Sequence, residues 1–204
     1  MFVKICGITN LDDALAAADA GADAVGFNFW KPGKRYVAPD RATEIAEQLT
    51  VKKIGVFVDE EIATVLEIAR QAAFDALQLH GAETPEYVRK LAPFEIWEAV
   101  KMDKPVDWTS FQASGVGTFL LDTPGTLPGG TGQTFDWSLA EAAKKHGRII
   151  LAGGLNPGNV ADAVRRVHPW GVDVASGVET KPGRKNHRLL RAFVRAARAA
   201  EGAT

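Results

Sequence analysis

Cys6 is the only cysteine of the chain, and it ends a short apolar run directly before Gly7. A thiol accepts a proton only as the thiolate, a form that nearby cations or a helix N-terminus stabilise. The plain alternative is a buried cysteine that packs as a small apolar side chain. The position of Cys6 at the end of a predicted strand, before a glycine turn, favours a chemical role.

Asp122 follows the apolar residues FLL in the same way. A carboxylate at the end of a buried strand is desolvated, so it is paired, hydrogen-bonded or functional. A cap or a turn anchor is the structural alternative. Asp173 is a rival acid, but it precedes the end of its predicted strand, and we expect it to be structural. A thiol and a carboxylic acid at one site predict proton transfer, in which one group takes a proton and the other donates one.

Two glycine-rich loops predict an anion site. Gly153 and Gly154 follow one predicted strand, and Ser176 and Gly177 follow the next. Glycine lets backbone N–H groups wrap an anion, and the start of a following helix adds partial positive charge. One such loop can serve only to turn the chain, but two in succession predict a phosphate site.

Two further stretches are candidates for contact with a substrate. KPGKRY carries Arg35, whose guanidinium can bind a carboxylate through two hydrogen bonds, while a solvated surface arginine is the alternative. GGTGQTFDW, residues 129–137, is interpreted as a flap, as another anion contact or as the entry to a helix capped by Asp136.

Short β-rich runs alternate with helix-period segments along the whole chain. Asn10 is a predicted N-cap, and a later helix is predicted to be entered at Thr84, with Pro85 in its first turn. Eight βα units in 204 residues favour a closed (β/α)8 TIM barrel, and we expect one domain, 1–204. The fifth unit is the weakest, because 101–117 offers only a short helix. The predicted strands are 2–6, 24–29, 53–58, 76–80, 95–100, 118–122, 148–152 and 171–176.

Barrels of this kind hold their active sites at the carboxyl ends of the strands. Cys6 and Asp122 would then face each other across the barrel mouth from the first and sixth strands. The two glycine loops follow the seventh and eighth strands, where such barrels frequently bind phosphate. These residues predict proton-transfer chemistry on a small phosphorylated substrate.

Composition argues against several classes of function. A formal net charge of −1 gives no indication of a surface for nucleic acid or an anionic membrane. No apolar run nears the roughly 20 residues that span a bilayer, and no signal peptide is predicted at the N-terminus. The four histidines are scattered, so no metal site is expected. A lone cysteine fits a reducing cytoplasm, which is the expected location.

Seven stretches taken together resemble one family, the phosphoribosylanthranilate isomerases of tryptophan biosynthesis. They occur in that family's order, from residue 2 to about residue 179 and on into the last predicted helix. The combination is specific, although the single pieces are not. The stretches are KICGIT, VGFNF followed by KRYV, QLHG, FLLDT, GGTGQTFDW, LAGGLNPGNV and DVASGVE.

The resemblance implies a (β/α)8 barrel that converts N-(5′-phosphoribosyl)anthranilate into 1-(2-carboxyphenylamino)-1-deoxyribulose 5-phosphate by an Amadori rearrangement. Cys6 would be the general base, Asp122 the general acid and Arg35 the ligand of the anthranilate carboxylate. The resemblance implies no metal or organic cofactor, and a monomer or a homodimer. The implied phosphate contacts are Gly153, Gly154, Ser176 and Gly177, with Gly132 as a neighbour.

Other functions stay open at this point. A non-catalytic barrel that binds a phosphorylated ligand needs the glycine loops, but it does not need Cys6 and Asp122 together. Another sugar-phosphate isomerase or epimerase predicts metal ligands or paired acids at strand ends, which the sequence lacks. A thiol redox sensor needs a resolving cysteine. Within the family, the use of a second aminoaldose of the histidine pathway as substrate also stays open.

Overall fold

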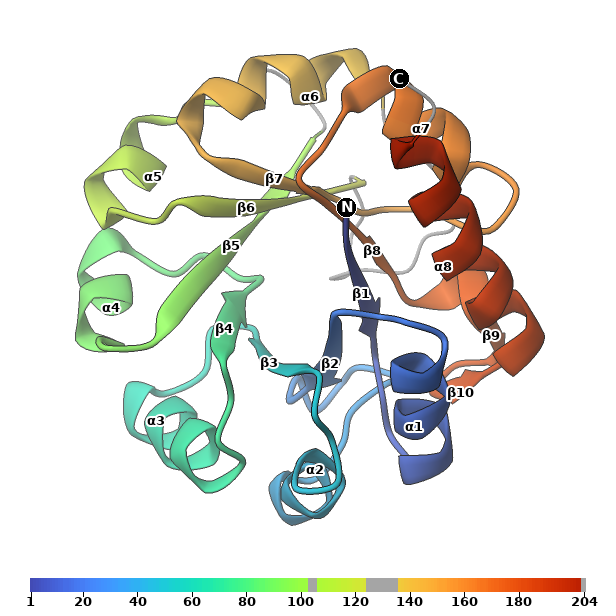
Figure 1. Cartoon of the computed structure of the whole chain (residues 1–204). Helices are drawn as coiled ribbons and strands as arrows, with labels where there is room; N and C mark the ends of the chain where they lie inside the picture. Colours follow the sequence, from blue (N-terminus) through green and yellow to red (C-terminus); the bar gives the residue numbers. More distant parts are fainter. Residues whose placement is uncertain (103–105, 124–135, 203–204) are drawn as a thin grey trace.

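The computed structural model describes residues 1–102, 106–123 and 136–202. Eight parallel strands close into a barrel in chain order, and helices surround it (Figure 1). This architecture confirms the predicted (β/α)8 barrel. The strands are β1 (Phe2–Cys6), β2 (Ala24–Asn28), β3 (Lys52–Phe57), β4 (Ala76–Leu79), β5 (Glu95–Lys101), β6 (Thr118–Asp122), β7 (Arg148–Leu151) and β8 (Gly171–Val174).

The helices alternate with these strands. Each βα unit has its helix, and the helix of the fifth unit is only six residues long, as its weak pattern predicted. No helix among the described residues is long and apolar enough to cross a membrane. The helices are α1 (Leu11–Asp19), α2 (Pro39–Ala46), α3 (Ile62–Gln71), α4 (Pro85–Lys90), α5 (Thr109–Ser114), α6 (Ser138–Ala143), α7 (Val160–Val167) and α8 (His187–Glu201), with short 3₁₀ turns η1 (Lys144–His146) and η2 (Ser176–Val178).

The predicted N-cap at Asn10 and the predicted helix entry at Thr84 are both confirmed. The Asn10 side chain accepts the backbone N–H of Asp13 at 3.0 Å, and Thr84 Oγ1 accepts that of Tyr87 at 3.2 Å. Each bond satisfies one of the donors that the first turn of a helix leaves unpaired. The Asp136 side chain accepts the backbone N–H of Ser138, the first residue of α6, at 3.0 Å, although Trp137 occupies the N-cap position and makes no side-chain hydrogen bond.

β1 and β6 have the predicted bounds, and the other six strands differ from theirs by one or two residues. The largest difference is at β8, which ends at Val174, because Ser176 already begins the turn η2. A short antiparallel hairpin, β9 (Glu179–Lys181) with β10 (Arg184–Lys185), follows η2 and was not predicted. This hairpin lies beside the barrel mouth and contributes to the site.

The barrel interior is packed with side chains. Its amino-terminal end is closed by aromatic rings, with Phe2 stacked on Trp170 at 4.5 Å between centroids and Trp97 edge-on to both. Alternate residues of a strand point to opposite faces, so every second strand residue enters this interior core. The buried members of the interior cluster are Ala24, Ile54, Ala76, Trp97, Leu120, Ile150 and Ala152.

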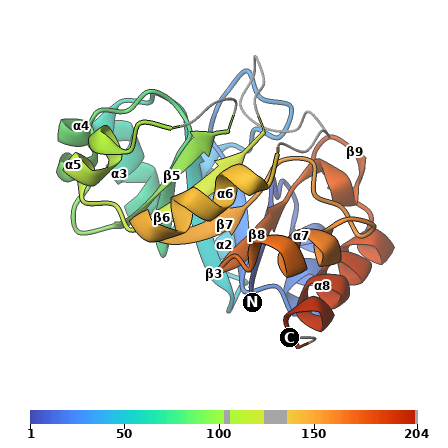
Figure 2. The same ribbon diagram turned by 90° about the horizontal axis from the view of Figure 1, so that it is seen from above.

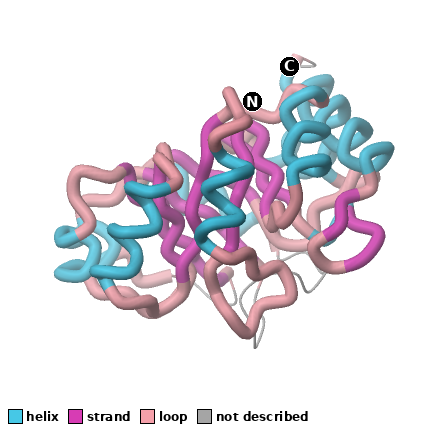
Figure 3. Tube along the Cα trace, turned by 90° about the horizontal axis from the view of Figure 1, so that it is seen from below, coloured by secondary structure: helices cyan, strands magenta, loops and turns pink. Residues whose placement is uncertain are grey.

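The start of β1 and the carboxyl end of α8 lie at the same end of the barrel, as Figures 2 and 3 show from opposite sides. The N-terminal amine forms an ion pair with Glu201 of α8. Arg198 of the same helix pairs with Asp23 at 2.7 Å. Because β1 also pairs with both β2 and β8, the first and last parts of the chain close the structure together.

Candidate active site

A pocket lies at the carboxyl ends of the strands, where the fold predicts chemistry. The residues of this pocket come from strands and loops far apart in the sequence. Gly177 is not part of its lining but directly follows Ser176 in η2, and Gly132 lies outside the described residues. The predicted site residues that line the pocket are Cys6, Arg35, Asp122, Gly153, Gly154 and Ser176.

The thiol of Cys6 is free and partly exposed at the end of β1. Gly7 follows with a φ of 74°, in the left-handed region that glycine enters without strain. A Cβ at Gly7 would lie 2.5 Å from Arg35 Cδ. The glycine therefore turns the chain and also lets the Arg35 stem pass close behind the thiol.

Burial raises the pKa of the Cys6 thiol above its ordinary value. The ammonium groups of Lys4 and Lys185 lower it in part, and the carboxylate of Asp173 raises it. In the free protein Cys6 is thus a thiol at neutral pH, and positive charge near it favours the thiolate.

Asp122 ends β6 and is 6% exposed. Its Oδ1 accepts the backbone N–H of Thr123 at 2.8 Å, and its Oδ2 lies 3.3 Å from His80 Nε2, outside hydrogen-bond geometry. His80 Nδ1 lies 3.4 Å from the side-chain nitrogen of Gln78. Gln78 and His80 both line the pocket, but the sequence had not singled them out. The signal available was polar residues within the buried run ALQLH, at the end of a strand.

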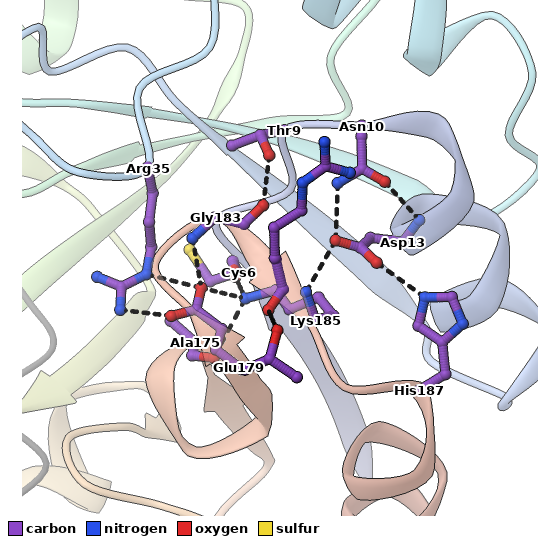
Figure 4. A network of polar contacts seen from close by, with 12 residues as sticks. Cys6, Thr9, Asn10, Asp13, Arg35, Ala175, Glu179, Gly183, Lys185 and His187 are labelled. Atoms are coloured by element: carbon purple, nitrogen blue, oxygen red, sulfur yellow. Dashed lines mark hydrogen bonds and ion pairs between the residues drawn. The ribbon is translucent and has the colours of Figure 1, made fainter.

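Arg35 reaches the pocket from the loop after β2 and forms a two-bond ion pair with Glu179 of the hairpin (Figure 4). Its Nε donates to Oε1 at 2.9 Å and its Nη2 to Oε2 at 2.7 Å. A guanidinium has five N–H donors in one plane, so the edge formed by Nη1 and Nη2 can still bind a second carboxylate.

Lys185 connects the hairpin to the end of β1. Its Nζ donates to the carbonyls of Cys6 at 2.6 Å and Ala175 at 3.1 Å, and to Glu179 Oε1 at 3.0 Å. Its backbone N–H donates to Asp13 of α1 at 2.8 Å. Burial by itself would raise the pKa of Glu179, but Arg35 and Lys185 hold it below its ordinary value. The network in Figure 4 thus keeps Glu179 ionised and fixes Arg35 beside Cys6.

Asp173 was expected to be structural, and it forms a buried ion pair with Lys4, with Nζ to Oδ1 at 2.9 Å. It also lines the pocket. Sequence position alone could not reveal the ion pair, because Lys4 lies 169 residues away.

The two glycine loops touch each other. Gly153 and Gly154 have φ values of 71° and 65°, and a Cβ at Gly177 would overlap the carbonyl oxygen of Leu155. A Cβ at Gly153 would overlap the Thr123 side chain. Only glycine allows this close approach, and the exposed N–H groups of such turns can surround an anion.

Among the described residues, no group of three or more His, Cys, Asp or Glu side chains could hold a metal ion. The groups in the pocket lining that can take part in chemistry include a thiol, carboxyl groups, an imidazole, a guanidinium and backbone amides. The closed barrel, with these groups at the carboxyl ends of its strands, defines the class of protein as a (β/α)8-barrel enzyme.

Comparison with known proteins identifies the family. Residues 3–196 match the model of the N-(5′-phosphoribosyl)anthranilate isomerase family, and the chain belongs to that family. The N-(5′-phosphoribosyl)anthranilate isomerase of Solibacter usitatus is 48% identical over 100% of both chains. That of Geobacter sp. (strain M21) is 46% identical over 94% of this chain and 95% of its own length.

Solved structures agree with this assignment. The phosphoribosylanthranilate isomerase of Thermotoga maritima is 42% identical, with a TM-score of 0.88 over 98% of this chain and 99% of its own. Another solved isomerase, 39% identical with a TM-score of 0.84 over 98% of this chain and 99% of its own, is described in complex with reduced 1-(o-carboxyphenylamino)-1-deoxyribulose 5-phosphate.

Proposed function

We propose that the chain converts N-(5′-phosphoribosyl)anthranilate into 1-(2-carboxyphenylamino)-1-deoxyribulose 5-phosphate, a step of L-tryptophan biosynthesis. The observation that carries the proposal is the presence of Cys6 and Asp122 in one pocket, at the ends of β1 and β6. The family assignment supplies the substrate. The whole chain, 1–204, acts as one catalytic unit.

Asp122 is the general acid of the first step. It donates its proton to the furanose ring oxygen, the bond from C1 to that oxygen breaks, and the nitrogen lone pair forms the iminium. The backbone N–H of Thr123, 2.8 Å from Oδ1, stabilises the carboxylate that remains.

Cys6 is the general base of the second step. Its thiolate removes the proton from C2, which the iminium has made acidic, and the electrons of that bond form the enolamine. Return of a proton to C1 and loss of the C2 hydroxyl proton then give the ketone, so the isomerisation gains and loses no atoms. Burial raises the pKa of the thiol, and the positive iminium beside it favours the thiolate when it is needed.

Arg35 and the glycine loops bind the two ends of the substrate. The edge of Arg35 that faces away from Glu179 holds the anthranilate carboxylate. The loops at Gly153–Gly154 and at Ser176–Gly177 hold the phosphate through their backbone amides, which their contact with each other supports.

The test is turnover of freshly made phosphoribosylanthranilate, followed by its fluorescence, for the wild type and for Cys6→Ser and Asp122→Asn. Each variant should lose about 10²–10⁴-fold in kcat, the usual effect of removing a general acid or base. Binding of a product analogue should persist in both. An inactive wild type would instead favour a phosphate-binding module, and a fully active Cys6→Ser would remove the base assigned here.

We further propose a cytoplasmic location, where a lone thiol stays reduced, and a monomer or a homodimer. The Thermotoga maritima isomerase is described as dimeric, which supports the second possibility. Size-exclusion chromatography with light scattering gives the mass of the protein in solution and so distinguishes the two states.

A further inference from the structure

Lys4 is a fully buried cation inside the barrel. It is 0% exposed and lies two residues before Cys6 on β1, so both side chains point to the interior face of the strand. Its Nζ donates to Asp173 Oδ1 at 2.9 Å. The proton transfers proposed above do not use this ammonium, although it lies directly below the thiol.

Gly26 on the neighbouring strand gives the thiol and the ammonium a common space. Cys6 and Gly26 are register partners of β1 and β2. A Cβ at Gly26 would lie 2.9 Å from Cys6 Sγ, 3.1 Å from Lys4 Cε and 3.2 Å from Lys4 Nζ. Because Gly26 has no side chain, the sulfur of Cys6 and the ammonium of Lys4 can both lie against its backbone.

Two ammonium groups lie near the thiol, but one of them has no proton to spare. Lys185 Nζ already donates three hydrogen bonds, to two carbonyls and to Glu179, and an ammonium has three protons. Within the described part of the chain, Lys4 Nζ donates to Asp173, and hydrogen bonding between Lys4 and Cys6 raises the pKa of Lys4. Lys4 is thus the cation with donors left for the sulfur. The charged or titratable groups around Cys6 are Lys4, Arg35, His80, Asp122, Asp173, Glu179 and Lys185.

The charges act on the thiol in opposite directions. Burial raises the pKa of Cys6, the ammonium of Lys4 lowers it more than that of Lys185 does, and Asp173 raises it. Burial would lower the pKa of Lys4, but Asp173 and Cys6 raise it above its ordinary value, so Lys4 stays charged.

We propose that Lys4 is a positioning residue for the reaction, whose buried ammonium holds the sulfur of Cys6 and stabilises its thiolate. The inference rests on the proposed function, because it gives that base its charge partner. Asp173 in turn keeps Lys4 in place and offsets part of its charge. Without Lys4, the thiolate would lie beside the Asp173 carboxylate in a desolvated site, an arrangement that disfavours ionisation.

The test uses the single thiol, which can be titrated without interference. Thiolate absorbance near 240 nm and the rate of alkylation by iodoacetamide are measured against pH in the ligand-free protein. Lys4→Met should raise the titration midpoint by at least about one unit, which lowers the thiolate fraction at pH 7 about tenfold. Asp173→Asn should lower the midpoint, because it removes a like charge.

A double variant guards against misfolding. Lys4→Met with Asp173→Asn removes both buried charges, so no unpaired carboxylate is left inside the barrel. Its midpoint should lie above that of the wild type and below that of Lys4→Met. Lys52→Met, at the exposed amino end of β3, makes the same change of net charge as Lys4→Met alone and should leave the midpoint unchanged.

Kinetics provides the second readout. The double variant should lose at least about tenfold in kcat, and the rise of kcat/KM with pH should move to higher pH. Unchanged titration of Cys6 in the double variant would overturn the role of Lys4, whether or not the protein is an isomerase. Loss of the proposed function is recognised separately, as an inactive wild type whose thiol still responds to Lys4.

Discussion

Gly153 is a single residue at which one methyl group has a large expected cost. Its φ of 71° lies in the left-handed region, and a Cβ there would overlap the Thr123 side chain and lie 2.9 Å from Asp122 Oδ1. An alanine here would therefore be destabilised twice, by the strain of the positive φ and by the overlap of its Cβ with these neighbours. A second glycine separates the two effects, because Gly115 has a φ of 76° and nothing within 4 Å of its Cβ position.

Gly153→Ala should lower the free energy of unfolding by at least about 2 kcal/mol and also lower kcat/KM, because Thr123 and Asp122 must shift. Gly115→Ala should lose only the backbone part, about 1 kcal/mol, with activity unchanged. Urea unfolding and steady-state assays of both variants measure this. Equal losses of stability and of activity in Gly153→Ala and Gly115→Ala would mean that the contact at Asp122 has no effect.

At the scale of elements, β5 carries a buried carboxyl on its outer face, under the short helix α5. Glu98 is 7% exposed, and among the described residues its Oε2 has no hydrogen-bond partner. Burial raises its pKa to about 7, while Ser114 lowers it and the charge of Glu83 raises it slightly. The protonated form is therefore the one that fits this site.

The pKa of Glu98 in the folded protein lies above its unfolded value of about 4.5, so its stabilising effect is present at low pH and is lost as pH rises to and above 7. Glu98→Gln should remove this loss. Its free energy of unfolding should be about 1–3 kcal/mol higher than that of the wild type at pH 8, with a smaller difference at pH 5. Urea midpoints at both values test it. The exposed Glu67→Gln should change stability by less than about 0.5 kcal/mol at either pH.

The β9–β10 hairpin is the element that connects α1, Arg35 and the end of β1. The side chain of Lys185 in this hairpin is fully buried, and its ammonium donates to three acceptors. Removal of that ammonium takes one donor from two partly buried carbonyls and leaves Glu179 with one partner fewer.

Lys185→Met should therefore lower the free energy of unfolding by about 3–5 kcal/mol, as expected for one partner of a buried ion pair. Arg184→Met, one residue earlier and exposed, is the matched control and should change it by less than about 0.5 kcal/mol. Thermal or urea unfolding distinguishes them. A small effect at position 185 would mean that water replaces the ammonium and that the hairpin is not held by it.

At the scale of the whole molecule, the aromatic packing that stabilises the barrel and the pocket lie at opposite ends of it. The aromatic cluster of Phe2, Trp97 and Trp170 closes the amino-terminal end, and the pocket lies at the carboxyl-terminal end. Among the described residues, none of these three aromatic side chains lines the pocket.

Trp97→Ala should lower the free energy of unfolding by about 3–5 kcal/mol, because it opens a large cavity in the barrel interior. Its kcat and KM, measured well below the unfolding temperature, should stay within about threefold of the wild type. A large loss of kcat in a variant that is still folded would contradict this separation of the two ends.

The sequence by itself determined the order of the elements, the barrel and several members of the site. Strand and helix periods are local, so the patterns around Cys6, Asp122 and the loop at Gly153 were sufficient to place them at strand ends. The capping residues Asn10 and Thr84 were predictable for the same reason, since their hydrogen bonds span three residues.

Only the tertiary structure decided how these residues are held. Lys4 pairs with Asp173 across 169 residues, Arg35 with Glu179 across 144, and Lys185 reaches Cys6 across 179. No local period records such pairs, because they depend on barrel closure, which brings β8 and the hairpin after it beside β1. The charges that set the ionisation of Cys6 are therefore a property of the closed barrel and not of any one segment.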